Sequence, residues 1–434
     1  LEKGGIAAYT RRIVSGTGYR DGLDLLRDRD LGRLFVARFV AAFGSAMAPV
    51  AMAFGVLELT GSATAMGIVI ASQSGASALL HPVGGALADR TSRQRMMGTA
   101  DTLGMISQGL IAFLLITGQA TVPVLAALMA VSGVAFALHY PAAMGLVPLV
   151  VDGAKLQPAN ALLSLARTGA FGMGAASGGV LVATVGAGWA MAINSVTFGV
   201  AALLVSTLRP RAQLRSEPTS MLRDLRDGWR EFTSHRWLWT VVLQFTVMFA
   251  AWMASFSVVG PIVAKRLLGG ATDWGWIAGA YGAGLLCGGI LALRLRVDRP
   301  ILVGALLMFL MALPPMLLAG PAPVGLIALS AFVAGMGFEL MMVLWYTAEQ
   351  THVAPETLSR VIAYDTLGSI VLVPLAEAAA GPATDMLGTS QTLWILVALI
   401  VLPTAAVLFV PEVRNLRSQP EPRQTGDPPA GNVG

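Results

Sequence analysis

The sequence predicts an all-α membrane protein with about twelve transmembrane helices in two six-helix bundles. Three observations support this fold class. Of the 434 residues, 55% are hydrophobic and only 12% are charged, whereas a soluble domain carries about 25% charged residues. Apolar segments of about 20 residues, the length needed to cross a bilayer, recur along the chain. One long hydrophilic stretch divides these segments into two sets of six.

The apolar segments meet the length requirement for membrane helices, although several contain Gly or Pro, which such helices tolerate. Glycine is abundant at 49 residues, as expected where helices pack closely in lipid. We expect the spans at about 34–57, 64–88, 97–117, 122–149, 159–185, 189–207, 237–266, 274–294, 301–319, 324–350, 358–387 and 391–411.

Basic residues occur mainly in alternate loops. Lys and Arg cluster before the first span, after the second, after the sixth and in the tail, whereas the short loops Thr60–Ser62 and Gly186–Gly188 carry none. The positive-inside rule therefore predicts that both termini are cytoplasmic. The net charge of +5 is explained by this membrane orientation, and we expect no binding to nucleic acid.

The chain divides into five predicted regions. The central linker has Leu222, Leu225 and Trp229 at helical spacing, so it is either an amphipathic helix on the inner leaflet or a solvated linker, and residues 21–33 leave the same choice open. The regions are a cytoplasmic N-terminal segment (1–33), an N-terminal bundle (34–207), the central linker (208–236), a C-terminal bundle (237–411) and a disordered tail (412–434).

The two halves share a weak internal repeat. At an offset of 202 residues, glycines and apolar residues of the fourth and fifth spans fall on identical residues of the tenth and eleventh. Repeats of this kind, with a substrate site between them, are a known transporter plan. The matched pairs are Gly133 and Gly335, Phe136 and Phe338, Leu138 and Leu340, Gly179 and Gly381, and Gly186 and Gly388.

A loop motif follows the second span. It contains Gly85, then Asp89 and Arg90, then Arg93 and Arg95. The glycine permits close helix approach, the acid suits the positive end of a neighbouring helix, and the arginines can bind acids or lipid phosphates. The motif resembles the loop signature of the major facilitator superfamily, and Asp101 in the third span is a plausible partner for its arginines.

Further stretches resemble one branch of that superfamily. They are Leu57–Ser62, Pro158–Ala161, the pair Gly178 and Gly179, and Gly186. Together they are similar to the bacterial macrolide-efflux and enterobactin-exporter proteins over about residues 28–412. The resemblance implies a monomer in the bacterial inner membrane that exports a small amphipathic molecule by alternating access, with the proton gradient as driving force.

Two features depart from the pattern of drug/proton antiporters. The fifth span has Gly174 and Ala175 where the antiporter signature has Gly-Pro, and the fourth span lacks the buried Arg found in many such proteins. The polar residues nearest to that Arg position are His139 and Tyr140, while Arg167 in the fifth span is the candidate to supply the missing charge.

Charged residues inside the spans are candidates for function, because a charge at the bilayer centre costs about 2.5–3.5 kcal/mol on insertion scales. Glu339 lies midway along the tenth span and is the predicted proton-coupling residue, with a hydrogen bond to a neighbouring helix as the alternative role. Glu377, in the eleventh span, could belong to the cavity or to an outer gate, and Asp365 is expected to pair with a cytoplasmic Arg at a gate.

Other titratable residues carry weaker predictions. Arg167 could pair with an acid across the cavity, and His139 could titrate near neutral pH or simply be packed. Acids near span ends are expected to be solvated or to cap helices. These acids are Glu58, Glu349 and Asp385.

Several functional classes are excluded or disfavoured by what the sequence lacks. It has no phosphate-cradling Gly-Lys-Ser/Thr loop, and its four histidines form no metal-ligand pattern. We therefore expect no cofactor, no metal and no enzymatic activity. Two alternatives to a proton-coupled exporter stay open: a facilitator or importer of a polar metabolite, and a lipid or lysolipid flippase of the same fold.

Overall fold

The computed structural model describes residues 25–151, 155–211, 221–295, 297–320 and 322–418. These residues form helices joined by short loops, with no strand among them. Within the same ranges, twelve helices or helix series are long and apolar enough to cross a membrane. The prediction of an all-helical membrane protein with about twelve spans is therefore confirmed.

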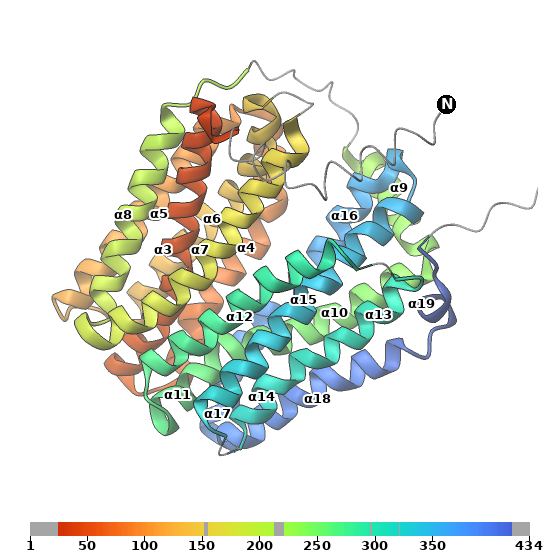
Figure 1. Cartoon of the computed structure of the whole chain (residues 1–434). Coiled ribbons are helices and arrows are strands. Elements are labelled where there is room, and N and C mark those ends of the chain that lie inside the picture. The colour runs from red at the N-terminus through yellow and green to blue at the C-terminus, as the bar shows by residue number, and fades with distance from the viewer. Residues whose placement is uncertain (1–24, 152–154, 212–220, 296, 321, 419–434) are drawn as a thin grey trace, which may run out of the picture.

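The N-terminal bundle consists of six long helices (Figure 1). A short 3-10 turn, η1 (Leu25–Arg27), precedes them. The first span begins earlier than expected because Asp28 caps its helix, its Oδ1 accepting from the amides of Asp30 at 3.0 Å and Leu31 at 3.1 Å. The helices are α3 (Arg29–Thr60), α4 (Ala63–Arg90), α5 (Arg93–Ile116), α6 (Val122–Val150), α7 (Leu156–Val185) and α8 (Ala187–Ser206).

The C-terminal bundle also supplies six spans, but three of them are built from successive pieces where the sequence predicted one helix. Proline explains the breaks, because it removes an amide donor from the helix ladder: Pro261, Pro314 and Pro374 each lie in the first turn of a piece. The pieces and helices are α10 (Arg236–Ala254), η3 (Ser255–Val259), α11 (Gly260–Leu267), α12 (Ala271–Ala292), α13 (Pro300–Met308), η4 (Phe309–Ala312), α14 (Leu313–Leu318), α15 (Val324–His352), α16 (Pro355–Ile370), α17 (Val373–Leu387) and α18 (Thr389–Val407), followed by α19 (Pro411–Asn415).

Corresponding glycines allow close helix packing in the two bundles. A Cβ atom built on Gly133 of α6 would lie 2.2 Å from the carbonyl oxygen of Gln73 on α4, and one built on Gly335 of α15 would lie 2.3 Å from that of Tyr281 on α12. Only glycine fits at such distances. The repeat noted in the sequence therefore relates two equivalent helix crossings.

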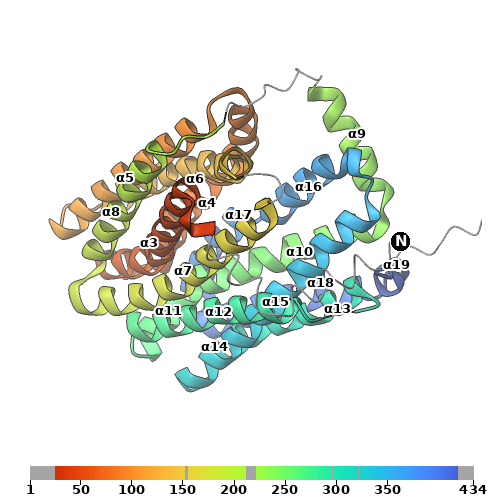
Figure 2. The same ribbon diagram turned by 45° about the horizontal axis from the view of Figure 1, so that its top comes forward.

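The bundles contact each other in one half of the molecule. We call the end where α8 finishes and α9 (Met221–Ser234) begins the linker end, and the opposite end the far end. A Cβ atom on Gly179 of α7 would lie 2.4 Å from Ala271 O of α12, and one on Gly381 of α17 would lie 2.5 Å from Ala63 O of α4. All four residues lie in the far half. Figures 1 and 2 show the bundles converging there and separating toward the linker end.

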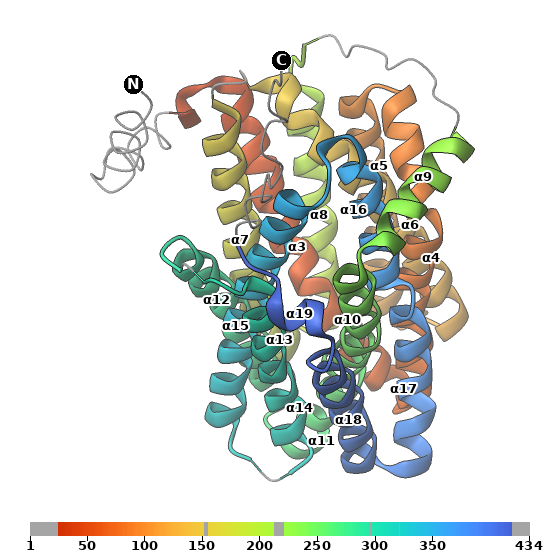
Figure 3. The same ribbon diagram turned by 90° about the vertical axis from the view of Figure 1, so that its right-hand side faces the viewer.

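The linker helix α9 packs on the C-terminal bundle. The rings of Trp229 and Phe232 lie with centroids 5.4 Å and 6.0 Å from that of Tyr364 on α16, and Figure 3 shows α9 and α16 at the same end of the molecule. Trp229 is one of the residues that suggested an amphipathic helix on the membrane surface. Part of its side chain packs instead on Tyr364 of α16. The side chains of Leu222 and Leu225, and residues 21–24, lie outside the described part.

Candidate transport site

Two arginines of the N-terminal bundle lie on the side that faces the C-terminal bundle. Arg38 of α3 donates a hydrogen bond to the carbonyl oxygen of Ala143 on α6. It lies within electrostatic reach of Arg167 on α7 and of Tyr140 on α6. Arg167 is exposed. This face therefore carries positive charge toward the space between the bundles.

Glu339 of α15 faces the N-terminal bundle from the opposite side. Its side chain is half-buried and packs on α12, where a Cβ atom built on Gly288 would lie 3.0 Å from the Cβ of Glu339. Arg167 and Tyr281 both lie within electrostatic reach of it. Among the described side chains, no ion pair joins Glu339 to Arg167. The sequence predicted that Arg167 could pair with an acid across the cavity. Glu339 is an acid of the opposite bundle within electrostatic reach of Arg167, but the two residues are not in contact.

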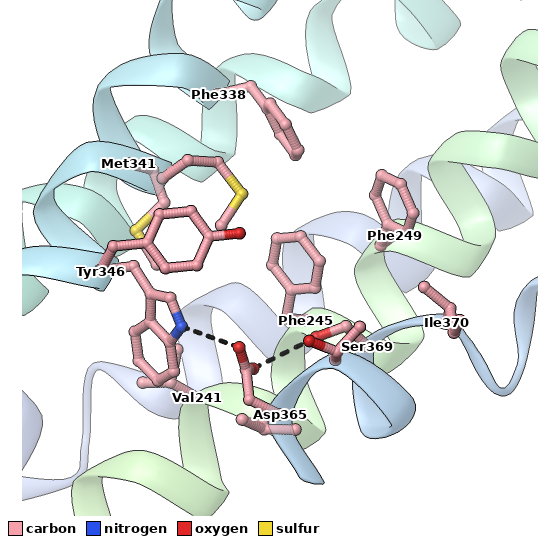
Figure 4. A pocket seen from close by; sticks show the side chains of 13 residues that line it. Val241, Phe245, Phe249, Phe338, Met341, Tyr346, Asp365, Ser369 and Ile370 are labelled. Carbon is pink, nitrogen blue, oxygen red and sulfur yellow. Dashed lines mark hydrogen bonds between the residues drawn. The ribbon is translucent and has the colours of Figure 1, made fainter. Parts of the chain in front are cut away.

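A pocket of about 170 Å³ lies in the C-terminal bundle, between α10, α15 and α16 (Figure 4). Phe245, Phe249 and Phe338 form one wall, with ring centroids 5.2–6.1 Å apart. The hydroxyl of Tyr346 points into the pocket. The remaining walls are largely apolar, so the pocket suits a small apolar or aromatic group.

Asp365 is the acid that lines this pocket. Its Oδ2 accepts a hydrogen bond of 3.2 Å from Nε1 of Trp345, and its Oδ1 accepts one of 3.4 Å from Oγ of Ser369 (Figure 4). The sequence predicted an arginine as its partner at a cytoplasmic gate. Its recorded partners are instead an indole and a hydroxyl, so its carboxylate can meet a ligand in the pocket.

Glu349 corrects an expectation from the sequence. Because it lies near the end of the tenth span, it was expected to be solvated or capping. Its side chain is 0% exposed, and neither carboxylate oxygen has a hydrogen-bond partner in the structure. Asp365 is the charged group within electrostatic reach of the Glu349 carboxyl group. The reason is that α15 continues to His352 and that Trp237 of α10 packs on Trp345 and His352, which covers this turn.

His139 and Asp101 form a hydrogen-bonded pair in the N-terminal bundle. Nδ1 of His139 lies 2.7 Å from Oδ1 of Asp101, whose side chain is 0% exposed. Asp101 was predicted to bind the loop arginines, but its recorded partner is this histidine. The His139 side chain is 23% exposed, so the pair is not sealed from the surroundings on the histidine side.

Glu377 lies at the contact between the bundles, in the far half. It is 1% exposed, and its Oε2 accepts a hydrogen bond of 2.5 Å from Oγ of Ser74 on α4. A second link lies nearby, where Thr64 Oγ1 donates to Oδ2 of Asp385 at 2.7 Å. The sequence left open a cavity or an outer-gate role for Glu377, and this position fits the gate.

The loop motif is described in part. Arg93 donates to the carbonyl oxygen of Gly145 on α6 at 2.7 Å, which ties the start of α5 to α6 at the linker end. Arg95 is exposed. The surroundings of Gly85 and the side chains of Asp89 and Arg90 lie outside the described part, so the contacts predicted for them stay predictions. The described residues contain no group of three or more His, Cys, Asp or Glu that could hold a metal ion.

Sequence reasoning missed the aromatic pocket. Phe245, Phe249 and Tyr346 are ordinary apolar or aromatic residues of membrane spans, and nothing in their spacing separates a pocket wall from a lipid-facing surface. The internal repeat carries a signal that points to part of the pocket. The offset of 202 places His139 on Met341 and Tyr140 on Met342, and both methionines line the pocket.

Two six-span bundles related by a repeat, with charged residues facing the space between them, define a secondary transporter. A sequence profile of the Major Facilitator Superfamily matches residues 34–372. The chain belongs to this family and is a multi-pass membrane transporter.

Relatives and solved structures agree with this assignment. The multidrug efflux pump Tap of Mycobacterium tuberculosis is 27% identical over 418 residues, covering 91% of this chain and 97% of that protein. Tap of Mycobacterium bovis gives the same values.

Among solved structures, a mutant of the nucleoside transporter NupG has a TM-score of 0.71 at 14% identity, covering 87% of this chain and 98% of its own. A bacterial homologue of the iron transporter ferroportin, in an inward-facing state, has a TM-score of 0.67 at 16% identity, covering 88% and 98%. A D-xylose-proton symporter has 0.66 at 15%, covering 91% and 99%. At these identities the structures bear on the fold alone.

Proposed function

We propose that the protein exports a small amphipathic molecule, such as a drug, natural product or siderophore, across the bacterial inner membrane in exchange for protons. The two bundles rock about their far-end contacts, so that the space between them opens alternately to each side. With the linker end cytoplasmic, the described conformation is open to the cytoplasm, the state in which an exporter loads its substrate.

The observation that carries this proposal is the position of Glu339. A carboxyl group half-buried within a membrane span, facing an arginine of the other bundle without contacting it, can take up and release a proton as the bundles move. In the closed state Arg167 approaches Glu339 and favours its ionised form, and in the open state the separation is larger. Proton binding and bundle movement are thereby coupled.

The assignment of the cargo rests on two further points. The pocket between α10, α15 and α16 is lined mainly by aromatic rings and methionine side chains, which adapt to varied apolar molecules. The relative that covers nearly the whole chain carries the name of a multidrug efflux pump. Both favour an amphipathic cargo over a sugar or amino acid, which would require several convergent polar groups.

The test uses purified protein in liposomes with a trapped pH indicator. Each of a panel of amphipathic drugs and siderophores is added, and proton flux is recorded for the wild type, Glu339→Gln and the control Glu58→Gln. Glu58 is an exposed acid at the far end of α3. We expect a substrate-triggered proton flux in the wild type and control that is lost in Glu339→Gln. Substrate movement without proton flux, equal in all three proteins, would instead indicate a facilitator or a lipid transporter.

A further inference from the structure

The acids of the C-terminal bundle occupy positions where the N-terminal bundle has apolar residues. At the repeat offset of 202, Glu349 falls on Val147 and Asp365 on Leu163. Val147 and Leu163 are each 1% exposed, so an apolar side chain satisfies the packing at these two places in the fold. The acids are therefore not needed to build the bundle, and their burial calls for another explanation.

At two other positions the charged residue belongs to the N-terminal bundle and the uncharged pocket residue to the C-terminal bundle. Arg167 of the N-terminal bundle falls on Ser369, which bonds to Asp365 in the C-terminal bundle. The first and seventh spans are both 32 residues long, and Arg38 and Phe245 are each the tenth residue of their span. The repeat thus places two cations at one site and a carboxylate with aromatic rings at the other.

The chemistry of the pocket matches one class of ligand. Three phenylalanine rings and the tyrosine surround a space of about 170 Å³, with a single carboxylate at one edge. Aromatic faces attract cations that have lost part of their hydration, most strongly where water is excluded. Among the described residues the recorded partners of Asp365 are Trp345 and Ser369, neither of them basic, so its carboxylate supplies the matching charge. We propose that this pocket binds a monovalent organic cation with an apolar or aromatic body, with Asp365 as its counter-ion.

Cation and proton compete for one carboxylate. When Asp365 is ionised, the cation binds and neutralises it. When Asp365 takes up one proton, the pocket loses its negative charge and the cation leaves. Glu349 is fully buried, has no hydrogen-bond partner in the structure and lies within electrostatic reach of Asp365. Two adjacent buried carboxyl groups resist double ionisation, so the competition between cation and proton at Asp365 depends on Glu349.

Other charged and titratable groups surround this pair. On α15, Tyr346 lies within electrostatic reach of both acids, and Arg167 and Tyr140 of the N-terminal bundle reach that tyrosine. No hydrogen bond or ion pair to either carboxylate from any of the remaining groups is recorded among the described residues. Those groups, on α9, α10, α15 and α16, are Arg226, Arg230, Glu231, His235, Arg236, His352, Arg360 and Tyr364.

The inference rests on the proposed function for its biological role, but its test needs no proton gradient. Benzyltrimethylammonium, a permanent cation, and neopentylbenzene, in which carbon replaces the cationic nitrogen, are titrated against the full chain in detergent. The affinities are measured by calorimetry against detergent blanks. We expect the cation to bind at least about tenfold more tightly than the neutral analogue. Its affinity should fall as the pH is lowered from about 8 to about 5, since the ligand itself does not titrate.

Variants locate the effect. Asp365→Asn should weaken cation binding at least about tenfold and remove its pH dependence, while Glu349→Gln should keep the binding and extend it to lower pH. Phe249→Leu should weaken binding of the cation and leave binding of the neutral analogue unchanged, because the substitution removes an aromatic face. Glu58→Gln serves as the matched acid control.

The wild type alone can overturn the proposal, even if a variant fails to fold. Equal affinity for the cation and its neutral analogue, or cation binding that does not change with pH, would do so. Folded Asp365→Asn with unchanged cation affinity would as well. Such results leave proton-driven transport of other cargo intact, whereas loss of proton flux with intact cation binding would refute the coupling and not the pocket.

Discussion

The two bundles are alike in how their helices pack and opposite in the charge they present. Gly133 and Gly335 sit at equivalent crossings, where a Cβ atom would lie 2.2 Å and 2.3 Å from a carbonyl oxygen of the neighbouring helix. The acids inside the C-terminal bundle, in contrast, have apolar counterparts. By the same offset, Glu339, Glu349, Asp365 and Glu377 fall on Ala137, Val147, Leu163 and Ala175, all of which are buried.

The N-terminal bundle shows the opposite pattern. Its inward-facing cations and polar rings occupy positions equivalent to pocket residues. By the offset of 202, Arg167, His139 and Tyr140 correspond to Ser369, Met341 and Met342, and as the tenth residue of its span Arg38 corresponds to Phe245. The comparison teaches that the shared glycines serve the fold, whereas the charges occur on one bundle or the other at positions where the fold does not require them; we propose that they serve transport. Substitutions at shared positions should therefore affect folding, and substitutions at unshared positions should affect activity.

The largest effect is expected at the shared glycines. Gly133→Leu and Gly335→Leu each force a side chain into the backbone of a neighbouring helix, so each should lower the free energy of unfolding by about 3 kcal/mol or more. Thermal unfolding in detergent and the yield of monodisperse protein measure this. Gly98→Ala is the control, because no atom lies within 4 Å of its added Cβ. If only one of the two substitutions lowers the free energy of unfolding, the two helix crossings are not equivalent.

A reciprocal exchange tests the unshared positions. Val147→Glu buries a carboxyl group at a position that is 1% exposed, and it should destabilise the N-terminal bundle by about 3 kcal/mol. Glu349→Val removes a buried carboxyl group without partners, and it should leave stability unchanged or raise it by about 1–3 kcal/mol while transport is lost. Unfolding midpoints and liposome flux report the two outcomes. Strong destabilisation by Glu349→Val would mean that the acid serves the fold.

A smaller effect is expected where the bundles meet. Ser74→Ala removes the hydroxyl that donates to Glu377 at 2.5 Å, and a hydrogen bond of this kind contributes about 0.5–1.5 kcal/mol. The far-end contact should weaken, and spin labels at the far ends of α4 and α17 should report a larger separated population. Ser72→Ala is the matched control, since its hydroxyl bonds within α4 to Ile68 O at 2.8 Å. An equal response from both variants would mean that the hydrogen bond between Ser74 and Glu377 does not hold the two bundles together at the far end.

The smallest effect concerns the cation opposite the pocket. Arg167→Ser introduces the residue found at the equivalent position of the C-terminal bundle and removes a positive charge within electrostatic reach of Glu339 and Tyr346. Binding of benzyltrimethylammonium should tighten by about threefold at low salt and less at high salt. Arg266→Ser, an exposed charge at the far end, should change nothing. Weaker binding in Arg167→Ser would place Arg167 among the ligand contacts.

The number of spans, the fold class and the family could be predicted from the sequence, because hydropathy and the loop motif are local signals. Span depth also identified Glu339 and Arg167 as charged residues inside the membrane, but it could not show which helix faces they occupy. The hydrogen bond between Asp101 and His139 could not be predicted, since it depends on how α5 and α6 meet across 38 residues of chain. The burial of Glu349 also escaped prediction, because it depends on Trp237 of α10, which packs over the last turns of α15.

The account stands most directly on whether Glu339 couples protons to substrate movement. The decisive measurement compares two modes of transport in the same liposomes: exchange of labelled for unlabelled substrate without a gradient, and uptake driven by an imposed proton gradient. We predict that Glu339→Gln keeps the exchange and loses the gradient-driven uptake, because the carboxyl group is needed to move the proton and not to move the cargo. Gradient-driven uptake in Glu339→Gln at the wild-type level would contradict the account.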